Sequence, residues 1–151
     1  MKVIVLFCIL VLGSFVPHVE GGPEALWDRK YQFITPHGIL VKDSMGFSQE
    51  EIATIVDKSW EWVKRCSGTE IDPRTRPLVI DYTTNLPPDY GGMIWFKGWY
   101  SYARVHPTDL WLSHFSLRHE MFHYVLRHSG EPPESNRSHK SPMWRKCAAV
   151  Y

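Results

Sequence analysis

The 151-residue sequence has little net charge, because 17 Lys and Arg residues against 16 Asp and Glu residues leave a formal charge of +1. Without a strong field of one sign, a chain does not attract nucleic acid or an anionic membrane surface, and we expect neither as a partner. Internal repeats and low-complexity segments are also absent. The sequence therefore predicts one ordinary globular domain, which we expect to be a monomer.

Long apolar runs are lacking as well, since the run at residues 3–12 is too short to cross a bilayer comfortably. Lys2 precedes this run, and Val19 and Gly21 fit the small-residue rule for a cleavage site. We therefore predict a signal peptide over residues 1–21 and a single domain over residues 22–151. After cleavage the protein would have no stable membrane anchor and would be secreted or periplasmic.

Cysteine is scarce, with three in the whole sequence. Cys8 would leave with the signal peptide, so Cys66 and Cys147 would remain. Two cysteines in an exported protein suggest one disulfide. Closing a loop of about 80 residues would stabilise the fold by roughly 4 kcal/mol in the chain-entropy model. The alternative, that either cysteine binds a metal, fits an oxidising compartment less well.

The most informative motif is His-Glu-Met-Phe-His at residues 119–123, which has the pattern H-E-x-x-H. On an α-helix, positions four apart project from the same face, so His119 and His123 can bind one zinc ion. Glu120 is then close enough to act as a general base on a metal-bound water. Apolar residues at three- and four-residue steps predict this helix, and Gly130 is a stop signal.

The residues before this helix predict a strand and a helix cap. Residues 109–112 are short and apolar and predict a strand. Ser113 or Ser116 can then cap the N-terminus of the helix. We expect the strand to lead directly into the metal-binding helix.

A catalytic zinc site usually has three protein ligands, so a third must come from outside the motif. His139 is the better candidate, because it follows the break at Gly130 in a polar loop that can fold back over the helix. Glu131 and Glu134 remain possible ligands in a tight return. His128 lies some 180° around the helix from His119, at about 100° per residue, and is aimed wrongly.

Other patterns predict a mixed α and β domain. Residues 48–66 begin with a capping box, Ser-Gln-Glu-Glu, and continue with helical apolar spacing. Residues 78–82 predict a core strand, and residues 93–96 and 100–105 predict a hairpin. One strand of this hairpin could be an exposed edge that binds an extended peptide through its backbone. Further short strands are expected at residues 31–34 and 39–41.

This order of elements, ending in a helix with His119-Glu120-x-x-His123, resembles the zincin-type metallopeptidases. The resemblance implies an α+β, zincin-like fold in which a small mixed sheet packs on a backing helix and an active-site helix. It also implies that His119 and His123 bind zinc and that Glu120 is the general base. The chain departs from the metzincin form, because Leu126 and Ser129 stand where that form has Gly and His.

We therefore expect a zinc-dependent metallopeptidase that acts on peptides or proteins, with Zn²⁺ bound by His119, His123 and His139. Glu120 would take a proton from the zinc-bound water as it attacks the scissile carbonyl, and would return that proton to the leaving amine. Two alternatives stay open. One is a non-catalytic exported zinc domain with a fourth protein ligand, and the other is an exported binding protein with an incidental H-E-x-x-H.

Overall fold

The computed structural model describes residues 32–112 and 114–147. The predicted signal peptide at residues 1–21 lies outside the described residues. Within the described ranges, helices and strands form one mixed α and β structure, which confirms the predicted α+β class. No helix in these ranges is both long enough and apolar enough to cross a membrane.

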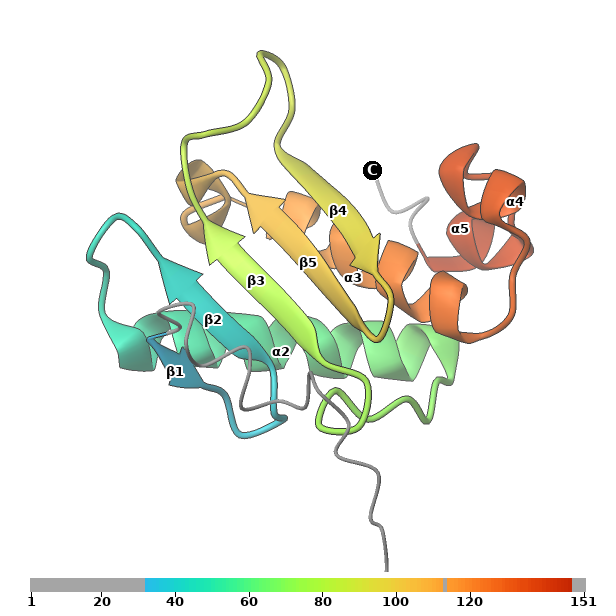
Figure 1. Ribbon diagram of the computed structural model, residues 1–151, viewed down its shortest axis with the longest axis horizontal. Helices are drawn as coiled ribbons and strands as arrows, with labels where there is room; N and C mark the ends of the chain where they lie inside the picture. Colours follow the sequence, from blue (N-terminus) through green and yellow to red (C-terminus); the bar gives the residue numbers. More distant parts are fainter. Residues whose placement is uncertain (1–31, 113, 148–151) are drawn as a thin grey trace, which may run out of the picture.

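A five-stranded mixed sheet forms the centre of the fold (Figure 1). Its order is β1-β2-β3-β5-β4, in which β2, β3 and β5 are parallel and the two outer strands are antiparallel to their neighbours. The strands are β1 (Phe33–Ile34), β2 (Leu40–Asp43), β3 (Leu78–Tyr82), β4 (Gly92–Lys97) and β5 (Tyr100–Val105). The predicted core strand and hairpin are therefore confirmed, and β4 lies at one edge.

Helix α2 (Gln49–Ser67) packs across one face of the sheet (Figure 1). Its predicted N-cap is confirmed, since Ser48 Oγ accepts a hydrogen bond from the backbone N–H of Glu51 at 3.4 Å. Gly68 ends the helix with a left-handed backbone. The buried face of α2, which includes Val56 and Trp60, belongs to the same apolar core as the inner side chains of β3.

Helix α3 (Phe115–His128) lies on the same face of the sheet and carries the H-E-x-x-H motif. The predicted strand at residues 109–112 is wrong, because this segment includes the end of a 3-10 helix, η1 (Pro107–Leu110), followed by a turn. The buried Asp109 carboxylate accepts hydrogen bonds from the backbone N–H groups of Ser116 and Leu117, at 2.9 and 3.2 Å. Asp109 therefore satisfies two of the N-terminal donors of α3, and the predicted cap Ser116 lies inside the helix and does not cap it. Ser113, the other predicted cap, lies outside the described residues.

Two short helices follow α3, namely α4 (Pro133–Arg137) and α5 (Pro142–Cys147). Figure 1 shows both at the end of the molecule beside α3. The predicted disulfide joins Cys66 at the end of α2 to Cys147 at the end of α5, with 5.7 Å between their Cα atoms. This covalent link ties the end of α5 to the end of α2.

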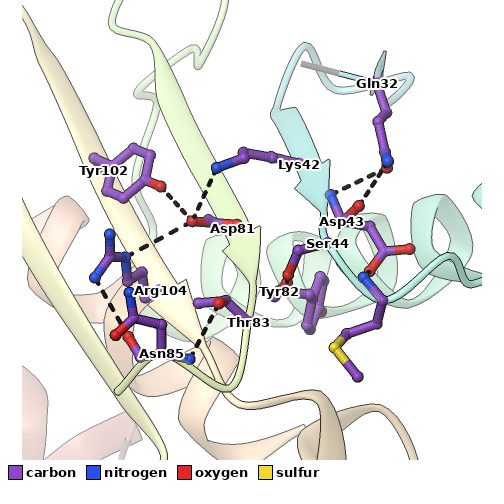
Figure 2. Close-up of polar contacts among 11 residues, drawn as sticks. Gln32, Lys42, Asp43, Ser44, Asp81, Tyr82, Thr83, Asn85, Tyr102 and Arg104 are labelled. Carbon is purple, nitrogen blue, oxygen red and sulfur yellow. Dashed lines mark hydrogen bonds and ion pairs between the residues drawn. The ribbon is translucent and has the colours of Figure 1, made fainter. Parts of the chain in front are cut away.

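The opposite face of the sheet carries a polar cluster around the buried carboxylate of Asp81 (Figure 2). The Tyr102 hydroxyl donates a hydrogen bond to the Asp81 carboxylate, and Lys42 Nζ and Arg104 Nε each lie 3.7 Å from the same oxygen. These residues belong to β2, β3 and β5, so the cluster holds three strands in register. Burial, and then the hydrogen bond to Asp81, raise the pKa of Tyr102, which therefore stays a hydrogen-bond donor.

Candidate metal centre and its cleft

Three imidazoles meet where the C-terminal segment folds back over α3. Those of His119 and His123 project from one face of α3, and that of His139 approaches from the loop after α4. Ligand-capable atoms of all three lie within 4.8 Å of one another, and the Nε2 atoms of His123 and His139 are 3.2 Å apart. The three predicted ligands are thus positioned to bind a metal ion.

His139 reaches this position through an unusual backbone. Its φ of +56° lies in the left-handed region, which residues other than glycine seldom adopt. The backbone N–H of His139 donates to the carbonyl of Asn136 at 3.3 Å, and that of Lys140 donates to Ser135 at 3.1 Å. The chain therefore reverses just after α4 and returns the imidazole toward α3.

The alternative third ligands point elsewhere. Nδ1 of His128 lies 3.1 Å from a guanidinium nitrogen of Arg76, away from the other histidines. The Glu131 carboxylate accepts a hydrogen bond from the Ser141 hydroxyl at 2.9 Å, and Glu134 is exposed on α4. Within the described ranges, only the three histidines form a group able to hold a metal.

Asn136 orients one ligand and was not anticipated from the sequence. Nδ1 of His123 donates to Oδ1 of Asn136 at 2.6 Å, and Nδ2 of Asn136 donates to the carbonyl oxygen of His123 at 3.0 Å. This pair of bonds leaves Nε2 of His123 with its lone pair toward His139. Asn136 is 3% exposed, so its side-chain amide is buried where it makes these two hydrogen bonds.

Trp144 of α5 forms a wall behind the cluster, and the sequence did not single it out either. Its ring centroid lies 4.7 Å from that of His119, 4.8 Å from that of His123 and 4.5 Å from that of His139. Because α5 is tied to α2 by the disulfide, Trp144 is fixed in place. The position of Trp144 three residues before Cys147 was the available sequence signal.

Burial keeps the histidines of α3 uncharged. Desolvation, reinforced by His123 and His139, lowers the pKa of His119 to about 4. Desolvation also lowers the pKa of His123, although its hydrogen bond to Asn136 acts in the opposite direction. At neutral pH both side chains therefore present the neutral imidazole that a metal requires.

The carboxyl of Glu120 is held beside the first residue of β4. Glu120 is 4% exposed, and burial raises its pKa to about 8. A Cβ atom added to Gly92 would lie 2.9 Å from Oε1 of Glu120 and 3.0 Å from its Cγ. Glycine at position 92 thus allows the edge strand to approach the acidic side chain of α3.

A cleft of about 630 Å³ runs past this site. One wall is β4 from Gly92 to Phe96, and the other is formed by α3 together with α4 and His139. His119, Glu120 and His123 all face this space. The histidine cluster is therefore accessible to a molecule bound along the edge of the sheet.

The outer edge of β4 faces the cleft with a row of backbone groups. The backbone N–H of His106 donates to the carbonyl of Gly91 at 2.8 Å, which marks these two residues as a hydrogen-bonded pair. Hydrogen-bonded pairs alternate along an antiparallel ladder, so the backbone groups of Gly92, Ile94 and Phe96 point away from β5. In the described part of the chain, no strand pairs with this edge.

Comparisons with known proteins give no relatives: no family model, no curated protein and no solved structure matches the chain.

Proposed function

We propose that this protein is a zinc-dependent metallopeptidase of the zincin type, which hydrolyses peptide bonds in a substrate bound along β4. The observation that carries the proposal is the convergence of His119, His123 and His139 in a cleft that also contains the Glu120 carboxyl. The same cleft is lined by the histidine cluster, by the acid–base group Glu120 and by the edge strand β4. Together they suit metal-dependent hydrolysis of a bound peptide, and neither alternative function needs all three.

The donor set fits zinc. Three imidazoles are a common ligand set of catalytic zinc, and the described residues offer no fourth ligand that would close the coordination sphere. Asn136 adds the hydrogen bond that usually orients a metal-binding histidine. When bound, zinc supplies Lewis-acid chemistry, because it polarises a carbonyl group and lowers the pKa of water.

Glu120 would move the protons of the reaction. As the oxygen of water bonds to the scissile carbonyl carbon, the Glu120 carboxylate accepts a proton from that water. The carboxylic acid then donates this proton to the amine nitrogen as the carbon–nitrogen bond breaks. Burial of Glu120 favours its protonated form, and a cation at the neighbouring histidines would favour its ionised form, so both states are accessible.

The edge strand would hold the substrate. An extended peptide can pair with the outward-pointing N–H and C=O groups of Gly92, Ile94 and Phe96 and so become an added strand of the sheet. Gly92 lies against Glu120, so the bond to be cleaved would lie near the start of β4. Backbone pairing positions any extended peptide, and side chains then decide which peptides bind best.

Export fits the same proposal. Cys66 and Cys147 form a disulfide, and such bonds persist in oxidising compartments. Together with the apolar leader expected at residues 1–21, this supports a secreted or periplasmic enzyme.

The decisive experiment compares the wild type with E120Q, and uses E134Q as the matched control because Glu134 is exposed on α4. Each purified protein is assayed for zinc by elemental mass spectrometry and for cleavage of a mixed peptide pool by mass spectrometry. We expect about one zinc ion per chain in all three, with cleavage by the wild type and E134Q only. Zinc without cleavage in the wild type would indicate a non-catalytic zinc domain, and absence of zinc would make the motif incidental.

A further inference from the structure

The charges along the cleft are unevenly distributed. Its acidic side chain is Glu120, at the Gly92 end, whereas Arg127 and Arg137 are cationic and exposed. In the described parts of the chain, no carboxylate lies within ion-pairing distance of either guanidinium. Both charges are therefore available to a molecule that binds in the cleft.

Arg127 has a defined position near the far end of β4. Its guanidinium lies over the Phe96 ring, 5.7 Å from the ring centroid. A guanidinium stacked in this way keeps its N–H donors at its rim, where they match the geometry of a carboxylate. Phe96 thus holds Arg127 beside the strand edge on which a peptide would lie.

The distance between Arg127 and Glu120 can be expressed in substrate residues. Seven residues of α-helix are nearly two turns, so both side chains lie on one side of α3, about 10 Å apart along its axis. An extended peptide advances by about 3.3 Å per residue. Arg127 is therefore about three substrate residues away from the bond next to Glu120.

We propose that Arg127 selects peptides with an acidic side chain about three residues from the scissile bond, with Arg137 adding positive potential at the same end. This inference rests on the proposed peptidase function and gives it a substrate class, acidic peptides. Antiparallel pairing is the commoner arrangement of strands. A peptide antiparallel to β4 would place the acidic residue on the N-terminal side of the scissile bond.

The test uses internally quenched peptides built around a sequence that the wild type cleaves. They differ only in Glu, Gln or Lys at the third residue on the N-terminal side, and a mirrored set varies the third residue on the C-terminal side. For the first set, we expect kcat/KM to be about fivefold higher with Glu than with Gln, as a partly exposed ion pair allows. R127A should abolish this preference, and R127E should favour Lys.

The matched control is R65A, which removes the same charge from an exposed position on α2 and should keep the preference for Glu. Equal kcat/KM for Glu and Gln peptides, or a preference that persists in R127A, would overturn the inference while peptide hydrolysis stood. A preference confined to the mirrored set would overturn the placement of the acidic residue.

Failure of hydrolysis itself is distinguishable. If the wild type cleaves no peptide, the preference can still be measured as binding affinity. Titration calorimetry then compares the affinity of the wild type and R127A for two peptides of equal length that differ only in Glu or Gln. Tighter binding of the Glu peptide that is lost in R127A would support the acidic-peptide site without catalysis. Equal binding of both peptides would overturn it.

Discussion

The Nε2 atoms of His123 and His139 lie 3.2 Å apart, although sixteen positions separate these residues in the chain. His123 is held by α3 and by Asn136, whereas His139 is held by a reversed loop. Two neutral imidazoles at this distance can share one proton or direct both lone pairs at one cation. Removing either histidine thus tests whether the cluster is a metal site.

H139A should weaken metal binding strongly, because two imidazoles would remain where three converge. We expect about one zinc ion per chain in the wild type and a marked loss in the variant, as measured by elemental mass spectrometry after dialysis. H37A is the control, since His37 lies beside Glu61 at 2.7 Å and outside the cluster. Equal zinc in the wild type and H139A would exclude His139 as a ligand.

N136A should reduce zinc affinity by about 10- to 100-fold, as the loss of a hydrogen-bond partner of a metal ligand typically does. The physical reason is that His123 would lose the acceptor of its Nδ1–H and could rotate. The measurement is a competition titration against a chromophoric chelator. N85A changes an exposed asparagine on the loop after β3 and should bind zinc like the wild type.

G92A should separate catalysis from metal binding. The new methyl group would meet the flexible end of Glu120, so the carboxyl should turn away while the histidines stay in place. We expect peptide cleavage to fall at least about tenfold, with zinc content unchanged, since a catalytic acid–base typically contributes 10²- to 10⁴-fold.

A double variant tests this route. If Gly92 acts through Glu120, G92A combined with E120Q should be no slower than E120Q alone. Additive losses of kcat/KM in the double variant would show that the methyl group harms the cleft in another way.

The stability of the metal-free protein should depend on His128. Burial, followed by the charges of Arg76 and Arg127, lowers the pKa of His128. The unfolded chain binds this proton near pH 6.5, and the folded chain binds it only at lower pH, so His128 reduces stability as the pH falls below about 6.5. The pKa of Glu120 is raised, so this residue increases stability as the pH falls, which is opposite to the effect of His128.

The test is therefore the difference between H128N and the wild type. In the presence of a chelator, Tm should fall less between pH 7 and pH 5 in H128N than in the wild type. An identical change of Tm in both proteins would contradict this prediction.

The elements predicted from periodicity were the reliable part of the sequence analysis. The apolar spacing of α2 and α3 and the apolar residues of β3 each require a particular local structure to be buried, so the pattern alone identifies them. The strand predicted at residues 109–112 was wrong because this segment lacks such a pattern. A short apolar run has no period of its own, and here a 3-10 helix places Asp109 beneath the start of α3.

The site was predicted most directly where its ligands lie on one helix, and His139 was predicted from its place in a polar loop after Gly130. His119 and His123 share a face by virtue of helical geometry, whereas His139 depends on a reversal of the chain after α4. Asn136 and Trp144 meet the histidines only in the folded molecule, through contacts between elements far apart in sequence. No local pattern encodes the contact of Asn136 with His123, and for Trp144 the position three residues before Cys147 was the available signal.

The open edge of β4 also bears on how copies of this protein meet. Within the described ranges no strand pairs with the outer edge of β4, which also carries apolar side chains such as Ile94 and Phe96. Such an edge is a template on which another chain can extend the sheet. Lys97 at the end of the strand places a charge there that opposes such stacking. The groups that would hold a peptide are thus the same groups through which concentrated protein would self-associate, and occupancy of the cleft would suppress aggregation.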